Sequence, residues 1–315
     1  MCPVGSEPAH VVTGEEHQHA TVVVATDRRC LWGCAVAGRS LIENGRPGGT
    51  IDFYLLHSGL SSTDLERVER SWTTPARNVR TLAIPFSIGR VGDLLRTKHV
   101  THMAYARLFL AELLPSHIDK CVYIDTDILF ELDVFELLHT PLDGCAVGAV
   151  PNGDDRDGAR QFRRLGIQGR RYFNSGVVLI DLDRWRARRI GEAALRFSRE
   201  FVGPLIMGDQ DALNAVLHDD WKVLPERWNT WASWIQDDEP RVTHFTMVPK
   251  PWHADYTGPL RDRFFAYLDR TAFAGRRPRN PLGLGPLVAR VGRKVPYWPT
   301  VLRLVRERLN RGKVG

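Results

Sequence analysis

The 315-residue sequence predicts an α/β fold with a mainly parallel central sheet and helices on both of its faces. Strand-like and helix-like segments alternate along the first half of the chain, which is the order of right-handed βαβ units. The strand-like segments are continuous apolar runs rich in β-branched residues, as expected of strands buried on both faces. Acidic residues follow two of these runs, at Asp27 and at the pair Asp125 and Asp127. Because ligands bind beyond the carboxyl ends of parallel strands, we expect the functional site there.

The first half begins with the β-branched run ATVVVA. Gly45 and Pro47 end the first helix, and Ser62 and Thr63 are candidate N-caps of the second. In chain order the predicted elements are strand 20–25, helix 33–44, strand 51–56, helix 61–72, strand 79–84, helix 101–114 and strand 121–124.

The second half is less regular. Pro, Gly and Trp are dense between residues 203 and 259, as expected of loops that shape a cleft. The predicted elements here are strand 145–150, strand 177–180, helix 182–201, helix 209–217 and strand 242–245.

Charge and periodicity divide the chain into three parts. Residues 1–19 are polar and lack a period, so we expect a disordered tail before one domain at 20–275. Residues 276–315 carry eleven Lys or Arg and one acidic residue, about +10, whereas the whole chain carries +6. The main domain is therefore mildly acidic, which argues against nucleic acid lying across it.

The sequence predicts a cytoplasmic protein. No stretch approaches the roughly 18 apolar residues of a membrane span, and the start has no apolar signal-peptide core. The five cysteines form no CxxC pair, so we expect free thiols. No GxGxxG or GxxxxGK[ST] motif follows the first strand, which excludes the usual dinucleotide and P-loop sites.

Asp125 and Asp127 interrupt the apolar segment CVYIDTDILFEL at residues 121–132. Two neighbouring carboxylates repel one another, and one would take up a proton unless a cation lies between them. A divalent ion would compensate both charges and could bind phosphate oxygens. The alternatives are solvated turn aspartates or a cap on a following helix. The apolar strand that leads into the pair favours the metal site.

Together with this pair, five other segments resemble glycosyltransferase family eight. These are retaining enzymes of the GT-A fold, and they include bacterial lipo-oligosaccharide galactosyltransferases and glycogenins. The resemblance implies a GT-A catalytic domain at 20–275 and a nucleotide diphosphate sugar as donor, with UDP-galactose or UDP-glucose expected. The similar segments, in the family's order, are ATD at 25–27, YARL at 105–108, CVYIDTDI at 121–128, YFNSGVVLIDL at 172–182, GDQDALN at 208–214 and HFTMVPKPWH at 244–253.

The resemblance implies that Asp125, Asp127 and His244 hold Mn²⁺, with Mg²⁺ as the alternative. One imidazole among oxygen ligands also favours Mn²⁺. Without the carboxylate pair, His244 would be interpreted as a packed histidine at a strand end. Lys250 lies between two prolines, and the family uses this lysine on the donor phosphate; a solvated lysine is the alternative.

The resemblance also implies a set of donor contacts. Asn174 could bond sugar hydroxyls or belong to a turn entering a strand, and Arg107 could contact the donor or form a structural ion pair. The expected donor-binding residues are Thr26, Asp27, Arg107, Asp125, Asn152, Asn174, Asp209 and Lys250.

Asp209 and Gln210 are the expected catalytic residues, because the family places this segment at the anomeric carbon of the donor. They could also be dipole partners at a helix N-terminus. Retention could use a double displacement, with Gln210 or a neighbouring carboxylate as nucleophile, or front-face attack in which a phosphate oxygen takes the acceptor proton. An amide is a poor nucleophile, so we favour front-face attack. Gln210 would stabilise an oxocarbenium-like state and Asp209 would bind sugar hydroxyls.

Three positions depart from the family pattern. Cys30 stands where members usually place a tyrosine that stacks on uracil, although Arg28 or Arg29 could stack on a base. Asn152 stands where an acid is common near the sugar. Met247 replaces a glycine, which we expect to remove a backbone conformation that glycine permits.

The acceptor side and the tail carry weaker signals. We expect His99, Asn152 and the segment Trp228–Trp234 to contact a saccharide, lipid-linked or small-molecule acceptor, because aromatic faces suit sugars.

Residues 297–311 place apolar side chains on one helical face, which is typical of a helix on a membrane surface. A helix docked on the body is the alternative, and nucleic-acid binding is the third interpretation. The membrane interpretation predicts a peripheral location on the inner membrane face.

These signals predict a metal-dependent, retaining glycosyltransferase that moves galactose or glucose from a nucleotide diphosphate sugar to a hydroxyl. Cys30 and Met247 suggest the alternative of a nucleotide-sugar-binding protein with impaired catalysis. A metal-dependent nucleotidyltransferase or phosphoester hydrolase is the other alternative. The intact segment 209–211 and Lys250 favour the first hypothesis.

Overall fold

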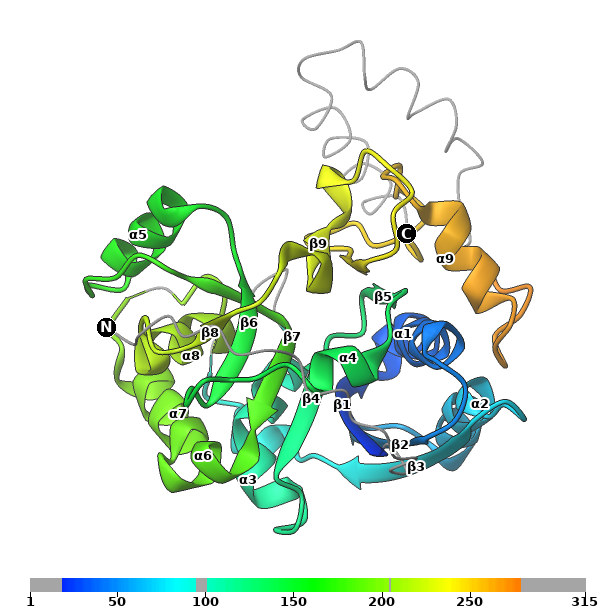
Figure 1. Cartoon of the computed structure of the whole chain (residues 1–315), viewed down its shortest axis with the longest axis horizontal. Coiled ribbons are helices and arrows are strands. Elements are labelled where there is room, and N and C mark those ends of the chain that lie inside the picture. Colours follow the sequence, from blue (N-terminus) through cyan, green and yellow to red (C-terminus); the bar gives the residue numbers. More distant parts are fainter. Residues whose placement is uncertain (1–18, 95–100, 204, 279–315) are drawn as a thin grey trace, which may run out of the picture.

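The computed structural model describes residues 19–94, 101–203 and 205–278 (Figure 1). A seven-stranded sheet has the order β3-β2-β1-β4-β7-β6-β8, and a three-stranded sheet has the order β5-β10-β9. In the larger sheet β7 runs antiparallel to its neighbours, and the other pairings are parallel. The strands are β1 His19–Asp27, β2 Thr50–Ser58, β3 Asn78–Pro85, β4 Lys120–Ile124, β5 Ile128–Phe130, β6 Val147–Pro151, β7 Phe173–Asp181, β8 Lys222–Val223, β9 Thr230–Trp231 and β10 Val242–His244.

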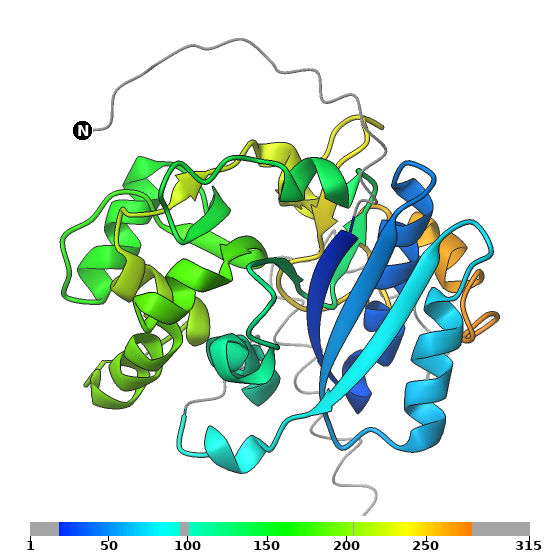
Figure 2. The ribbon, with the colours of Figure 1, turned by 60° about the horizontal axis from the view of Figure 1, so that its bottom comes forward.

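Helices cover both faces of the larger sheet (Figures 1 and 2). Successive residues of β1 show why: Val22 and Val24 belong to a core shared with α1, α2 and α9, whereas Val23 belongs to a core shared with η3, α6 and α7. The α-helices are α1 Leu31–Asn44, α2 Ser62–Trp72, α3 Leu110–Leu113, α4 Val134–Leu138, α5 Asp155–Arg164, α6 Leu182–Ala187, α7 Ile190–Glu200, α8 Asp209–Leu217 and α9 Arg261–Leu268. The 3-10 helices are η1 Arg28–Cys30, η2 Ile88–Arg90, η3 His102–Phe109, η4 Glu226–Trp228 and η5 Ala232–Trp234.

The predicted α/β class and its mainly parallel sheet are confirmed, and several boundaries differ. The strand expected at 121–124 is β4, which begins one residue earlier, and the apolar residues after the aspartates form a further strand, β5, in the smaller sheet. Most of the helix expected at 101–114 is the 3-10 helix η3. The helix expected at 182–201 is divided into α6 and α7, because Arg189 adopts a left-handed conformation with φ of 50°.

The N-terminus of α2 corrects a prediction about capping. The cap is Ser61, not Ser62 or Thr63, because the Ser61 hydroxyl accepts a hydrogen bond from the backbone N–H of Asp64. The Asp64 carboxylate in turn accepts from the backbone N–H of Ser61 at 3.2 Å. The two residues form a reciprocal capping box.

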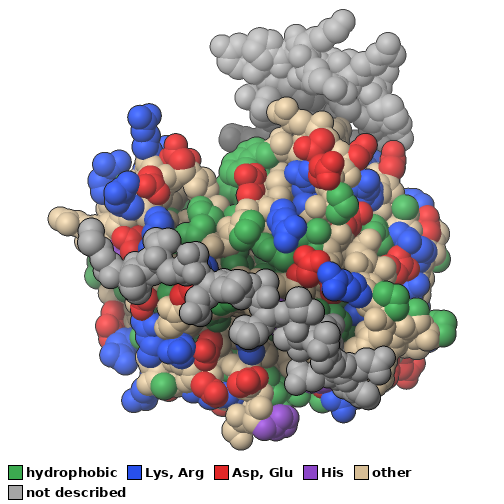
Figure 3. Space-filling model, viewed as in Figure 1, with side chains coloured by type: hydrophobic (Ala, Val, Ile, Leu, Met, Phe, Trp, Pro, Cys, Tyr) green, Lys and Arg blue, Asp and Glu red, His purple; other side chains and the backbone are tan. Residues whose placement is uncertain are grey.

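The predicted tails fall almost entirely outside the described residues. β1 begins at His19, one residue before the predicted start, and residues 1–18 and 279–315 are not described. Within the described ranges no helix combines the length and the apolar character needed to span a membrane. On the face shown in Figure 3, Lys and Arg side chains are interspersed with Asp and Glu, so the described part of this face presents no continuous basic surface.

Candidate active site

The carboxyl ends of β1, β4 and β6 and the start of β7 lie at one edge of the larger sheet, because β7 is antiparallel to the other three. Asp27 ends β1, Asp125 follows β4, and Asn152 follows β6. Asn174 lies at the start of β7. The structure thus brings these four predicted residues to the same edge.

Asp125, Asp127 and His244 form a cluster in which one ligand atom from each lies within 4.8 Å of the others. His244 Nε2 is 3.4 Å from Asp127 Oδ1. The ammonium of Lys250 bonds the Asp127 carboxylate and donates to the backbone oxygen of Phe245 at 2.6 Å. Burial disfavours the charged form of Asp127, yet Lys250, together with His244 when its ring is protonated, holds the pKa of Asp127 below its usual range. The expected convergence of the three residues is therefore present.

The smaller sheet explains how His244 reaches the carboxylate pair. β10 pairs with β5 in antiparallel register, with His244 opposite Ile128. The backbone N–H of Phe245 also donates to the backbone oxygen of Asp127 at 2.9 Å. Because β5 starts directly after Asp127, this pairing carries His244 to the end of β4.

Arg107 is buried and joins η3 to two acidic residues. Its Nη2 donates to Asp125 Oδ1 at 2.7 Å, its Nε lies 2.9 Å from Asp209 Oδ2, and its guanidinium lies over the Tyr123 ring at 4.1 Å. Burial and the proximity of Asp125 raise the pKa of Asp209 to about 7, although Arg107 opposes the shift. These contacts are those of the predicted ion pair, and direct contact of Arg107 with a donor stays a prediction.

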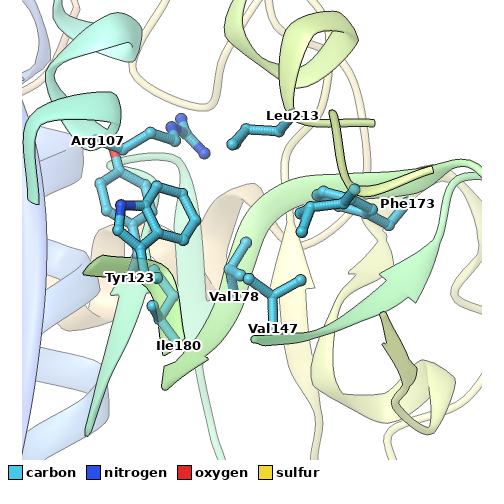
Figure 4. A pocket seen from close by; sticks show the side chains of 9 residues that line it. Arg107, Tyr123, Val147, Phe173, Val178, Ile180 and Leu213 are labelled. Atoms are coloured by element: carbon cyan, nitrogen blue, oxygen red, sulfur yellow. The ribbon is translucent and has the colours of Figure 1, made fainter. Parts of the chain in front are cut away.

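A small pocket beneath Arg107 belongs to the core (Figure 4). Apart from Arg107 its lining is apolar or aromatic, and it lies on the face of the sheet covered by α6 and α8. Without convergent polar groups it does not suit a sugar nucleotide. The labelled lining residues are Arg107, Tyr123, Val147, Phe173, Val178, Ile180 and Leu213.

The buried first turn of α8 lies against β7. Gln210 Oε1 accepts from the backbone N–H of Ser175 at 2.9 Å. Asp211 accepts from the Tyr172 hydroxyl at 2.6 Å and from the backbone N–H of Met207 at 2.9 Å. Asp211 therefore secures the turn, and Asp209 and Gln210 lie at a helix start as predicted.

The end of β1 carries the predicted donor residues Thr26 and Asp27. Thr26 is buried, and its hydroxyl donates to the backbone oxygen of Asp27 at 3.2 Å. Asp27 pairs with Arg29 at 2.6 Å. Burial raises the pKa of the Cys30 thiol to about 11, with smaller contributions from Asp27 and Asp127, so the thiol stays protonated near neutral pH.

The backbone at Met247 differs from what the sequence predicted for a residue that replaces the family's glycine. It adopts φ of 67°, so the left-handed backbone conformation persists in spite of the side chain. The expectation that Met247 removes this conformation is wrong. The cost of a Cβ there, about 1 kcal/mol, is small enough for the rest of the loop to offset.

The acceptor candidates separate into different environments. Trp228 is buried in the core, whereas Trp231 and Trp234 stack with ring centroids 4.4 Å apart and Trp234 is 46% exposed. β9 pairs with β10 so that Trp231 is in register with His244. Asn152 is partly exposed, and His99 lies outside the described residues.

Sequence reasoning missed Asn229. This buried residue follows η4, and its Oδ1 lies 3.0 Å from His244 Nδ1. An asparagine among tryptophans has no periodic or spacing signal of its own. Its role becomes visible only when β9 and β10 are paired.

Comparisons with known proteins agree with this geometry. A family model described as glycosyl transferase family 8 matches residues 21–256. The chain is 28% identical over 252 residues to general stress protein A of Bacillus subtilis, covering 74% of this chain and 87% of that protein. It is 27% identical over 276 residues to lipopolysaccharide 1,2-glucosyltransferase of Escherichia coli K12, covering 82% and 80%.

A solved structure has the same fold. The galactosyltransferase LgtC, in complex with donor and acceptor sugar analogs, superimposes with a TM-score of 0.67 at 24% identity. The match covers 84% of this chain and 99% of the LgtC chain. It confirms the predicted GT-A type of architecture.

Proposed function

This chain belongs to glycosyl transferase family 8 and is a glycosyltransferase, and we propose that it moves galactose or glucose from a UDP-linked donor with retention at the anomeric carbon. The convergence of Asp125, Asp127 and His244 at the sheet edge carries the proposal. We assign the acceptor as a hydroxyl of a saccharide or glycolipid, with a small molecule as the alternative. Similarity to a lipopolysaccharide glucosyltransferase supports a glycolipid.

The cluster fits a divalent cation, which we assign as Mn²⁺ with Mg²⁺ as the alternative. Two carboxylates and one imidazole suit such an ion, and Asn229 orients the other ring nitrogen of His244 as is usual around metal-bound histidines. When bound, the cation supplies positive charge to the donor diphosphate. Lys250, which already bonds Asp127, would add a second positive charge on the leaving diphosphate.

We assign the donor sugar to the space bounded by α8 and the ends of β6 and β7. Asn152 and Asn174 offer amides to sugar hydroxyls, and Asp209 a carboxylate. Asp209 is already oriented by Arg107, which also holds Asp125. Thr26 and Asp27, at the end of β1, would face the nucleoside.

The surroundings of Gln210 favour front-face attack over a double displacement. Its carbonyl oxygen already accepts from a backbone N–H, which withdraws electron density from an atom that is a weak nucleophile in any case. Gln210 would instead present a fixed dipole to the positive charge that develops at the anomeric carbon. The acceptor hydroxyl would lose its proton to an oxygen of the departing diphosphate.

The stacked pair Trp231 and Trp234 is our candidate for the acceptor surface. Trp234 is exposed and Trp231 is partly buried, and Trp231 lies in β9 in register with His244, so a saccharide on this pair would lie beside the cation site. Apolar sugar faces stack on such rings.

Hydrolysis of the donor without acceptor tests the proposal. We expect Mn²⁺-dependent release of UDP from UDP-galactose or UDP-glucose, reduced at least about a hundredfold in Asp127→Ala because the cation loses a ligand. Asp238→Ala, which removes an exposed carboxylate outside the cluster, is the matched control and should retain activity.

Two results would contradict this function. Thermal stabilisation by UDP-sugar and Mn²⁺ without any release of UDP would identify a binding protein. Release of pyrophosphate or of a nucleoside monophosphate would identify nucleotidyl transfer or phosphoester hydrolysis.

A further inference from the structure

A chain of side-chain hydrogen bonds joins His244 to Asn152 across the site. His244 Nδ1 lies 3.0 Å from Asn229 Oδ1, and Asn229 Nδ2 donates to Asn174 Oδ1 at 2.9 Å. Asn174 Nδ2 donates to Asn152 Oδ1 at 3.0 Å. Asn229 is 2% exposed, and Asn174 and His244 are also buried, so the two bonds of Asn229 form where water does not compete, whereas the bond to the partly exposed Asn152 lies nearer the surface.

One backbone group determines the direction of this chain of bonds. The N–H of Gly176 donates to Asn174 Oδ1 at 2.9 Å, and a backbone nitrogen can only donate, so this atom of Asn174 must be its carbonyl oxygen. Asn229 must then turn its NH₂ toward Asn174, because two oxygens would repel. Its own oxygen therefore faces His244 and requires a proton on Nδ1 of that ring.

The donor-to-acceptor direction of these hydrogen bonds determines which atoms His244 and Asn152 can offer to other groups. At His244 the neutral ring keeps its lone pair on Nε2, the nitrogen that faces Asp127 and that a cation would bind. With the proton on Nε2 instead, the buried Asn229 oxygen would lack a donor at this position. At the other end Asn152 turns its oxygen toward Asn174, so its NH₂ group is turned away from Asn174 and can donate to a ligand.

We propose that Asn229 is a positioning residue that holds His244 in the tautomer with Nε2 free, and that the Gly176 N–H sets the direction of the hydrogen bonds from His244 to Asn152. The metal-binding consequence rests on the proposed function, whereas the tautomer does not.

Three variants separate this role from general stability. Asn229→Leu removes both bonds at similar volume, whereas Asn229→Asp retains the acceptor for His244 and loses the donor to Asn174. Asn214→Leu is the matched control, because Asn214 is also buried and bonds the backbone of Phe173 and Gln210 without touching His244.

Two measurements apply to each variant. Nitrogen NMR of ¹⁵N-histidine-labelled protein without metal, at a pH where the ring of His244 is neutral, reports its tautomer. Electron paramagnetic resonance titration with Mn²⁺ and UDP reports the metal affinity.

The variants are expected to differ in these two properties. We expect the Nδ1–H tautomer in the wild type and in Asn229→Asp. In Asn229→Leu we expect this preference to be lost and Mn²⁺ to bind about 10- to 100-fold more weakly. Asn214→Leu should lose thermal stability and retain both properties.

A wild-type ring protonated on Nε2 would overturn the proposal, and this measurement needs no variant to fold. Unchanged tautomer and Mn²⁺ affinity in Asn229→Leu would also overturn it. A wild type with the Nδ1–H tautomer that binds no Mn²⁺ in the presence of UDP would support the positioning role and refute the metal-dependent function.

Discussion

At the scale of single residues, Met247 retains a backbone conformation that ordinarily favours glycine. A Cβ in the left-handed region costs about 1 kcal/mol, and both methionine and alanine carry that cost. We therefore expect Met247→Gly to have a free energy of unfolding about 1 kcal/mol higher than Met247→Ala. Denaturant unfolding of the two variants tests this. The strain argument fails if the alanine variant is as stable as the glycine variant.

Gly176 lies where no side chain fits. A Cβ there would lie 2.2 Å from His244 Cε1 and 2.6 Å from its Nδ1. We expect Gly176→Ala to displace the His244 ring and to weaken Mn²⁺ binding about tenfold or more. Titration with Mn²⁺ measures the effect. Gly92→Ala is the control, because its nearest contact would be 3.6 Å away. Equal Mn²⁺ affinity in the two variants would contradict this geometry.

At the scale of elements, α1 connects the core to the metal cluster. A Cβ on Gly33 would lie 2.4 Å from the backbone oxygen of Thr126, between the two aspartates, and 2.6 Å from Trp252. On the same helix a Cβ on Gly38 would lie 2.2 Å from Trp72, which packs between α1 and β2. The two glycines therefore control different contacts of one helix.

These contacts predict that substitutions at Gly33 and Gly38 differ in their effect on metal binding, although both lower stability. Gly33→Ala should lower both the melting temperature and the Mn²⁺ affinity, because the backbone of Thr126 must shift. Gly38→Ala should lower the melting temperature alone. Calorimetry and Mn²⁺ titration of both variants test this difference, and loss of affinity in Gly38→Ala would refute it.

The pairing of β5 with β10 shows what element prediction missed. The sequence predicted a strand at 242–245 and showed the apolar residues of β5 within the segment 121–132, but apolar runs contain no information on which strands pair. Separation of β4 from β5 at the aspartates places the second aspartate beside His244. The sequence likewise did not show which acids Arg107 contacts. Arg107 lies on a 3-10 helix, and its side chain pairs with Asp125 and Asp209.

At the scale of the whole molecule, the described domain and the basic tail are expected to act together. The tail's arginines beyond Arg277 lie outside the described residues, and each would gain about 1 kcal/mol near an anionic bilayer. In the full chain, the triple variant Arg303→Glu, Arg306→Glu and Arg308→Glu should bind phosphatidylglycerol vesicles on the order of a hundredfold more weakly. Cosedimentation measures binding, with phosphatidylcholine vesicles as control. Equal binding by both proteins would contradict a membrane role for the tail.

The sequence by itself determined the α/β class, the range of α8 and the presence of acids at the strand ends, because apolar runs, caps and helical periods act between near neighbours. Tertiary structure alone decided which side chains share the site. Lys250 meets Asp127 across 123 positions of sequence, and Asn229 meets His244 through strand pairing. Contacts between distant segments leave no local period, so they arise only when the sheets form.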